Sequence, residues 1–228
     1  MTLLPLSEIE TFVRARLDEV ANGDAGFVNA DSLNIANAVR RCAETAIRNI
    51  HLIAPNVLLD GIRPDNNMPT CTVSNGVGTF KAPAEFMRLV SMRFNGWDIP
   101  VQTLINEDSV EYRKQRNKFL RGTPRHPVAA ITHASPDNGF VIEAYTVGDH
   151  PTLADFRYVP EIKITDDKIS ICPKLKQSCL YAVTAEVARC FGDERRAQTF
   201  EALSRQQLNP TADDDRIYPA NGEKTIES

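Results

Sequence analysis

Apolar residues near the start of the chain recur at spacings of three and four, the period of an amphipathic α-helix. A first helix is predicted over residues 7–21, with Ser7 and Glu10 as a capping box at its start. A second helix is predicted over residues 31–53, and Pro55 stops it. Two helices are therefore expected to open the chain.

The pattern changes after Pro64, where proline, glycine and β-branched residues become frequent and apolar and polar positions alternate. This alternation predicts short strands over residues 70–73, 78–81, 87–94, 128–133, 139–147, 157–164 and 169–172. Between them, Asn106-Glu107-Asp108 caps a basic and aromatic helix that runs to about Leu120. The middle of the chain is predicted to be mostly sheet with one helix.

Helical spacing returns after Pro173. The apolar residues that line up there are Leu180, Val183, Val187 and Phe191. A last helix is predicted over residues 193–208, and Asn209-Pro210 ends it. Residues 209–228 are polar, with an acidic run at 213–215, and are predicted to form an extended tail that is disordered when the protein is alone.

These elements predict an α+β protein in which a helical bundle from both chain ends carries an inserted β-rich subdomain and an extended C-terminal tail. The expected bundle comprises residues 1–62 and 173–208, the β-rich subdomain with its one helix comprises residues 63–172, and the tail comprises residues 209–228. A single α+β domain with one continuous core is the alternative, and the sequence does not separate the two.

Composition and charge restrict the class of protein. With 228 residues, 42% of them hydrophobic and 25% charged, the chain can bury a core without a disulfide scaffold. The formal net charge of −4 does not suit a protein that coats nucleic acid, so any DNA contact is expected to be local. The chain has no apolar stretch of about 18 residues, and its first residues lack a basic secretion signal, so we expect no membrane contact.

Five cysteines are spread along the chain without a Cys-x-x-Cys pair, which favours a reducing cytoplasm. They are Cys42, Cys71, Cys172, Cys179 and Cys190. Cys172 and Cys190 have apolar sequence neighbours, so they are expected to act as small hydrophobic side chains and not as nucleophiles.

No catalytic, cofactor-binding or metal-binding motif is predicted, so the chain is expected not to be an enzyme. The nearest approach to a phosphate-binding loop is Gly76-Val77-Gly78, which lacks the lysine and third glycine and is interpreted as a turn or bulge. The histidines form no pair at the spacing of zinc ligands. An approach of His126 and His133 across a strand is the alternative to a surface or capping role for each. We therefore expect no cofactor.

Basic residues concentrate in and after the predicted central helix. They are Arg113, Lys114, Arg116, Lys118, Arg121 and Arg125, and Tyr112 and Phe119 lie among them. The run is a candidate for contact with a neighbouring acidic subunit or with the DNA of a channel. The alternative for each residue is the solvated face of a short helix.

The order of elements resembles a known family. A helical hairpin leads to Ala82-Pro83-Ala84-Glu85-Phe86-Met87-Arg88-Leu89-Val90 and then to Trp97-x-x-Pro100-Val101. A helix centred on Tyr112, strands ending at Tyr158 and closing helices with Ala182, Ala185, Ala188 and Ala197 follow. Over most of residues 7–208, this order resembles the head-to-tail adaptor, or ring, proteins of short-tailed and crAss-like phages.

The resemblance implies a structural virion protein, assembled in the host cytoplasm and located at the portal–tail junction. Such proteins form a homo-oligomeric ring, typically of twelve copies, that binds the portal protein, extends the DNA channel through which the genome leaves, and offers a platform to the next tail component. Contact with viral DNA would be transient and non-specific. In that family the C-terminal tail often extends onto the portal, which makes Arg216, Ile217, Tyr218 and Pro219 candidate portal-binding residues.

Two other functions remain open from the sequence. A nucleic-acid-binding module using residues 113–125 predicts steep salt-dependent binding to DNA. A small hydrolase or transferase without a familiar signature predicts a deep pocket that holds titratable groups with shifted pKa values.

Overall fold

A computed structural model of the chain describes residues 1–18, 30–64, 68–134 and 139–209. Within these residues the protein is mixed α+β, as predicted, and it has five α-helices and three sheets. The chain forms two compact units: unit 1 is Met1–Leu59 with Ile162–Ser228, and unit 2 is Asp60–Glu161. In the part of the chain described, each helix is too short or too polar to cross a lipid bilayer.

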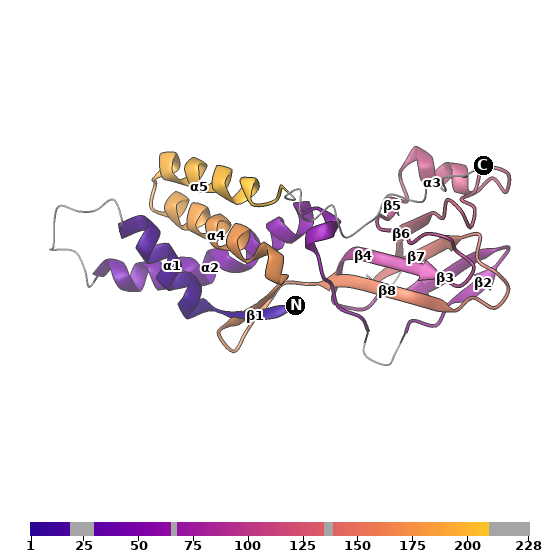
Figure 1. The fold of residues 1–228 in the computed structure, drawn as a ribbon, viewed down its shortest axis with the longest axis horizontal. Coiled ribbons are helices and arrows are strands. Elements are labelled where there is room, and N and C mark those ends of the chain that lie inside the picture. The colour runs from indigo at the N-terminus through magenta and orange to yellow at the C-terminus, as the bar shows by residue number, and fades with distance from the viewer. Residues whose placement is uncertain (19–29, 65–67, 135–138, 210–228) are drawn as a thin grey trace, which may run out of the picture. The chain divides into compact units, whose positions relative to one another are not determined.

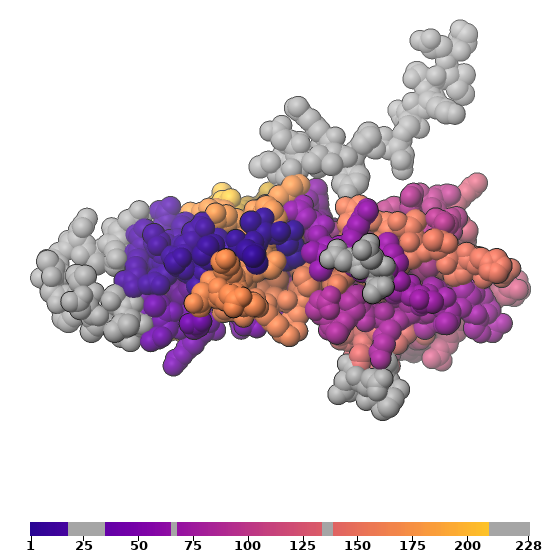
Figure 2. Space-filling model, turned by 90° about the horizontal axis from the view of Figure 1, so that it is seen from below, coloured from indigo at the N-terminus to yellow at the C-terminus, as the bar shows by residue number. Residues whose placement is uncertain are grey.

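Unit 1 takes its helices from both ends of the chain. They are α1 (Leu6–Asp18), α2 (Ala30–Ile53), α4 (Lys176–Cys190) and α5 (Glu194–Gln206). Helix α4 packs against the other three (Figure 1). The buried residues at their contacts include Ile9, Val13, Val39, Ile47, Val183 and Val187. In Figure 2 the early segments of this unit, coloured indigo, and the late ones, coloured orange, share one surface.

A small antiparallel sheet joins the two chain segments of unit 1. Its strand order is β1 (Thr2–Pro5), β10 (Lys168–Ile171) and β9 (Ile164–Thr165). Pro5 lies on the edge strand β1, where its missing N–H breaks no ladder bond. Asp166 and Asp167 both have positive φ and form the tight turn between β9 and β10. The first residues of the chain are thereby paired with Lys168–Ile171, in the second chain segment of unit 1.

Unit 2 contains a five-stranded sheet. Its strand order is β2 (Thr72–Ser74), β3 (Val77–Lys81), β7 (Gly139–Tyr145), β6 (Ala129–Ala134) and β5 (Ile105–Asn106). Neighbouring strands are antiparallel except β5 and β6, which are parallel. Asn75 and Gly76, both with positive φ, form the turn between β2 and β3, so the Gly76-Val77-Gly78 segment is a hairpin turn and strand, as interpreted from the sequence.

A second, two-stranded sheet of unit 2 pairs β4 (Phe86–Phe94) with β8 (Leu153–Pro160), and register shifts interrupt the ladder. Aromatic side chains from both sheets form the core: the Phe80 and Phe156 rings meet edge to face with centroids 5.6 Å apart. The Trp97 indole is buried against Phe94, and its N–H donates to the carbonyl of Thr146.

Several predicted boundaries are wrong. Helix α1 begins at Leu6, whose N–H donates to the carbonyl of Asp167, so Ser7 lies inside the helix and is not its cap. The strand predicted over residues 157–164 divides, because β8 ends at Pro160 and Ile164 starts β9 opposite Ile169. The central helix α3 (Val110–Gln115) is shorter than predicted at both ends: Ser109 caps it in place of Asn106-Glu107-Asp108, and the chain turns immediately after Gln115.

Candidate functional site

The basic residues singled out in the sequence lie on and after helix α3. The Ser109 hydroxyl caps this helix by accepting a hydrogen bond from the N–H of Tyr112 at 3.1 Å. The segment then carries several exposed side chains, which we call the α3 surface: Val110, Arg113, Lys114, Arg116, Lys118, Phe119 and Leu120.

Hydrogen bonds hold the turn after α3 in place. The buried Gln115 side chain accepts from the N–H of Gly122 at 2.8 Å. The guanidinium of Arg121 donates to the carbonyls of Gln115 at 2.8 Å and Asn75 at 2.6 Å. A Cβ at Gly122 would lie 2.9 Å from the backbone nitrogen of Val128, so only glycine fits there. The exposed side chains of this segment therefore project from a fixed backbone.

Helix α3 is also held to the five-stranded sheet through polar aromatic side chains. On β7, the Tyr145 hydroxyl donates to the Glu143 carboxylate at 2.7 Å, and the Tyr112 side chain of α3 hydrogen bonds with the same carboxylate. The Arg116 guanidinium lies over the Tyr112 ring, 5.6 Å from its centroid. Burial, and then the hydrogen bond with Glu143, raise the pKa of Tyr145. Burial and Glu143 likewise raise the pKa of Tyr112, so both phenols stay neutral.

The α3 surface combines exposed apolar groups with cations. Phe119 is 93% exposed, and Val110 and Leu120 are each 58% exposed. Arg113 and Lys114, in the last turn of α3, are also exposed. Large apolar side chains held in water beside arginine are typical of protein-contact surfaces, where aromatic and arginine side chains contribute most of the binding energy.

The six basic candidates differ in their surroundings. Arg113, Lys114, Arg116 and Lys118 are exposed. The Arg125 side chain is also exposed, and its Nε lies 4.0 Å from the Asp98 carboxylate. Arg121 is half-buried and donates to backbone carbonyls, so its role in the structure is to fix the turn.

Acidic residues that are candidate partners for these cations in a neighbouring copy lie at the start of α5 and in the tail. Asp193 caps α5, accepting from the N–H of Arg196, and also forms an ion pair with the Arg196 side chain. Glu194 forms an ion pair with Arg189 at 3.6 Å. The tail candidates lie outside the described residues: Asp213, Asp214, Asp215, Arg216, Ile217, Tyr218 and Pro219.

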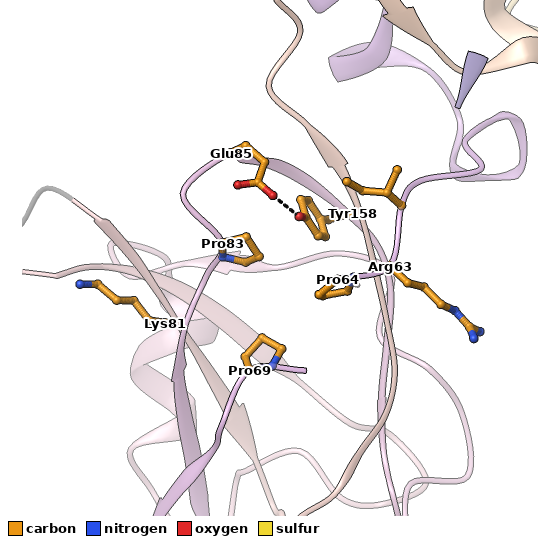
Figure 3. Close-up of a pocket in the computed structure, with 8 residues that line it drawn as sticks. Arg63, Pro64, Pro69, Lys81, Pro83, Glu85 and Tyr158 are labelled. Atoms are coloured by element: carbon orange, nitrogen blue, oxygen red, sulfur yellow. Dashed lines mark hydrogen bonds between the residues drawn. The ribbon is translucent and has the colours of Figure 1, made fainter. Parts of the chain in front are cut away.

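A hollow of about 480 Å³ lies in unit 2, as Figure 3 shows. Its described lining residues are Ile62, Arg63, Pro64, Pro69, Lys81, Pro83, Glu85 and Tyr158. The Tyr158 hydroxyl donates to the Glu85 carboxylate. Arg63 reaches away from the hollow to the Asp155 carboxylate, at 2.8 Å.

The lining of this hollow is partly apolar and partly polar. Three proline rings give it apolar faces, and the Glu85–Tyr158 pair is already hydrogen bonded. Its described lining contains no serine, cysteine or histidine to act as a nucleophile or to activate one. The sequence did not indicate this hollow, because its lining comes from segments as far apart as Ile62 and Tyr158, and such proximity leaves no local pattern.

The histidines take separate structural positions. His133, on β6, pairs with Glu107 at 2.9 Å, and the N–H of His126 donates to the carbonyl of Thr123 in a turn. His126 and His133 therefore have different partners and do not meet in these hydrogen bonds. Over residues 1–18, 30–64, 68–134 and 139–209, no group of three or more His, Cys, Asp or Glu side chains is placed to hold a metal ion.

Comparison with known proteins identifies no family for this chain. No protein-family model matches this sequence, and no curated protein is significantly similar to it.

Proposed function

We propose that this chain is a structural subunit of the virion of a tailed phage, forming a ring between portal and tail. The ring extends the DNA channel and serves as the attachment platform for the next tail component. It is assembled in the host cytoplasm from copies of this chain, twelve in the proposed ring. The role is mechanical, so no side chain has to carry out chemistry.

The α3 surface is the observation that carries this proposal. Phe119 is almost fully exposed on a backbone that Gln115 and Arg121 hold in place. Burying a phenylalanine side chain contributes about 1.5–3 kcal/mol, and a fixed backbone lowers the entropy lost on binding. A ring repeats such a contact at every interface through two different surfaces of each subunit. Cations beside Phe119 suit a neighbouring acidic surface.

The two units have separate roles in the proposed ring. Helices from both chain ends form a bundle, and the β-rich unit 2 presents the α3 surface to a neighbouring copy. The C-terminal tail reaches the portal through Arg216, Ile217, Tyr218 and Pro219. Ile217 and Tyr218 are the apolar residues of an otherwise polar segment, and they gain burial only when a partner supplies a groove.

The exposed cations favour a second candidate, a nucleic-acid-binding module that uses residues 113–125. Arg113, Lys114, Arg116 and Lys118 all reach solvent, as phosphate contacts require. Binding to DNA would then weaken steeply with salt, and neutralising Arg113 and Arg116 would lower the salt dependence. Phe119 favours the oligomeric assembly over DNA binding. Burying its exposed aromatic side chain stabilises a protein–protein contact more than a contact with the DNA backbone.

The proposal is tested by light scattering on the purified protein, alone and mixed with the portal ring from the same source. Full-length chain is compared with a chain that ends at Leu208. We expect saturable binding of about one copy per portal subunit by the full-length chain, and its loss after truncation. If the protein stays monomeric, does not bind the portal and binds DNA, the second candidate function replaces the proposal.

A matched pair of variants tests the α3 surface. Phe119→Ser removes the exposed ring from unit 2, whereas Phe191→Ser removes a ring that is 49% exposed in unit 1. We expect Phe119→Ser to weaken self-association of the portal-bound subunits at least tenfold, with thermal stability unchanged. Equal effects of the two substitutions would show that Phe119 has no special place in the contact.

A further inference from the structure

Two thiols from distant parts of the chain meet on unit 1. Cys42 lies on α2, and Cys190 is the last residue of α4, 148 positions later. Their sulfur atoms are 3.5 Å apart. Cys42 is half-buried and Cys190 is exposed, and both are free thiols. The exposure of Cys190 corrects the sequence prediction: Val187 and Ala188 are buried, but the end of the helix leaves the Cys190 thiol in solvent.

We propose that Cys42 and Cys190 form a reversible disulfide that joins α2 to α4 when the protein meets a peroxide. A disulfide has a sulfur–sulfur distance of about 2.0 Å, so the two atoms need to approach by about 1.5 Å, a movement of side-chain size. The inference rests on this distance and the exposure of Cys190, and it is independent of the proposed ring.

The exposed thiol reacts first. The Cys190 thiolate attacks one oxygen of hydrogen peroxide, the O–O bond breaks, and a sulfenic acid and hydroxide form. The Cys42 sulfur then attacks the Cys190 sulfur, the sulfenic hydroxyl leaves, and its protonation gives water. In total two thiols and one peroxide give one disulfide and two waters, with two electrons passing from the thiols to the peroxide.

The surroundings of Cys42 suit a slow structural crosslink more than a catalytic dithiol. Burial raises the pKa of the Cys42 thiol to about 12, and the hydrogen bond with Cys190 and the charge of Glu186 act in the same direction. Little thiolate is present at neutral pH, so attack on a free oxidant is slow. In the second step, the contact with Cys190 offsets the low thiolate fraction of Cys42, because the sulfur that it attacks is already adjacent.

The crosslink would close a long loop of chain. Residues 42 and 190 enclose all of unit 2, Asp60–Glu161, and they lie in the two separate segments that form unit 1. A bond between these segments lowers the entropy of the unfolded chain, and the effect grows with the length of the loop. In a reducing cytoplasm the pair stays open, and it closes in an oxidising medium.

The test treats the folded full-length protein with hydrogen peroxide, blocks remaining thiols with N-ethylmaleimide and digests it with trypsin without reduction. Cleavage after Arg41, Arg48, Arg189 and Arg195 releases peptides 42–48 and 190–195. We expect mass spectrometry to find these two peptides linked, two of the five thiols lost, and a unit 1 melting temperature about 5–10 °C higher. Dithiothreitol should reverse all three changes.

Control variants separate this bond from other oxidation. Cys42→Ser and Cys190→Ser should each abolish the linked peptides and the rise in melting temperature. Cys71→Ser, which removes a half-buried thiol from unit 2, should leave both unchanged. Three outcomes would each overturn the proposal. They are maleimide on both peptides after peroxide treatment, over-oxidation of Cys190 while Cys42 stays a free thiol, and a Cys190–Cys190 bond between two chains.

Discussion

At the residue scale, His51 links two segments of unit 1 through a buried imidazole. Its Nδ1 lies 2.9 Å from the Ile47 carbonyl, and its Nε2 lies 3.0 Å from the backbone nitrogen of Cys172. A backbone N–H can only donate, so Nε2 accepts and Nδ1 carries the proton that is donated to Ile47. The ring therefore satisfies the N–H at the point where the chain leaves β10 for α4.

Replacing His51 should destabilise unit 1. His51→Leu leaves the buried N–H of Cys172 without its acceptor, so we expect the free energy of unfolding to fall by about 1–3 kcal/mol. Urea unfolding followed by far-UV circular dichroism measures the loss. His51→Gln, whose side-chain oxygen can accept, should recover part of it. Equal stability of the Leu variant and the parent would remove His51 from this role.

Glu107 gives a pH dependence to its hydrogen bonds with His133. Its carboxylate accepts from the His133 side chain and backbone, and these bonds lower the pKa of Glu107. Because the folded-state pKa is the lower one, the stabilisation is complete above the unfolded carboxyl pKa of about 4.3 and is lost as the pH falls through the folded value. NMR titration of the Glu107 carboxyl checks this: His133→Ala should raise the pKa toward its ordinary value, and an unchanged titration would contradict the pairing.

At the scale of elements, α4 and α5 approach closely through two buried serines. The Ser178 hydroxyl donates to the carbonyl of Ser204 at 2.9 Å, and the Ser204 hydroxyl donates to the carbonyl of Ser178 at 2.8 Å. Both side chains are buried, and small residues are needed where two helix backbones come this near. The reciprocal bonds fix the register of the two helices.

A larger side chain at this contact should separate the helices. Ser204→Ala loses one hydroxyl and should cost about 1 kcal/mol, whereas Ser204→Leu adds overpacking and should cost about 2–4 kcal/mol. Ala202→Leu places the same side chain on an exposed position of α5 and should be nearly neutral. The urea midpoints of the three variants measure their relative stability. If Ser204→Leu were as stable as Ser204→Ala, the contact would tolerate a larger side chain.

Elements with their own hydrophobic period were predicted well from the sequence. The long helix α2 and strands β3, β4 and β7 each show their hydrophobic period within one continuous segment of the sequence. Strands β1 and β5 were missed, because they are short and are defined by partners elsewhere in the chain, such as the pairing of Leu3 with Ser170. Such pairing is tertiary and leaves no local period.

The candidate surface was predicted in part. Its cations are visible in the sequence as a cluster around Arg113 and Lys118, but their exposure depends on how the chain turns after α3. The sequence did not predict that Arg121 is held by backbone carbonyls, since one acceptor, Asn75, lies 46 positions away. The exposure of Phe119 depends on the same turn, in which its N–H donates to the Asn117 side chain.

At the scale of the whole molecule, unit 2 has the organisation of an inserted domain. Ile62 and Tyr158 exchange backbone hydrogen bonds of 2.8 and 3.1 Å, so the chain enters and leaves this unit at neighbouring positions. The aromatic core around Phe80 and Phe156 is drawn entirely from residues of the unit. An insertion with adjacent ends and its own core can fold independently of its host.

Residues 60–161 expressed alone should therefore fold as a cooperative unit. Trp97 is the one tryptophan of the chain and is buried in this core, so its fluorescence reports unit 2 in the fragment and in the full-length protein alike. We expect the urea midpoints from Trp97 fluorescence to agree within the error of the measurement. Phe156→Ala, which empties part of the aromatic core, should lower both midpoints equally, by the equivalent of about 3–5 kcal/mol. A fragment whose Trp97 is solvent-exposed without urea would show instead that unit 2 needs unit 1 to fold.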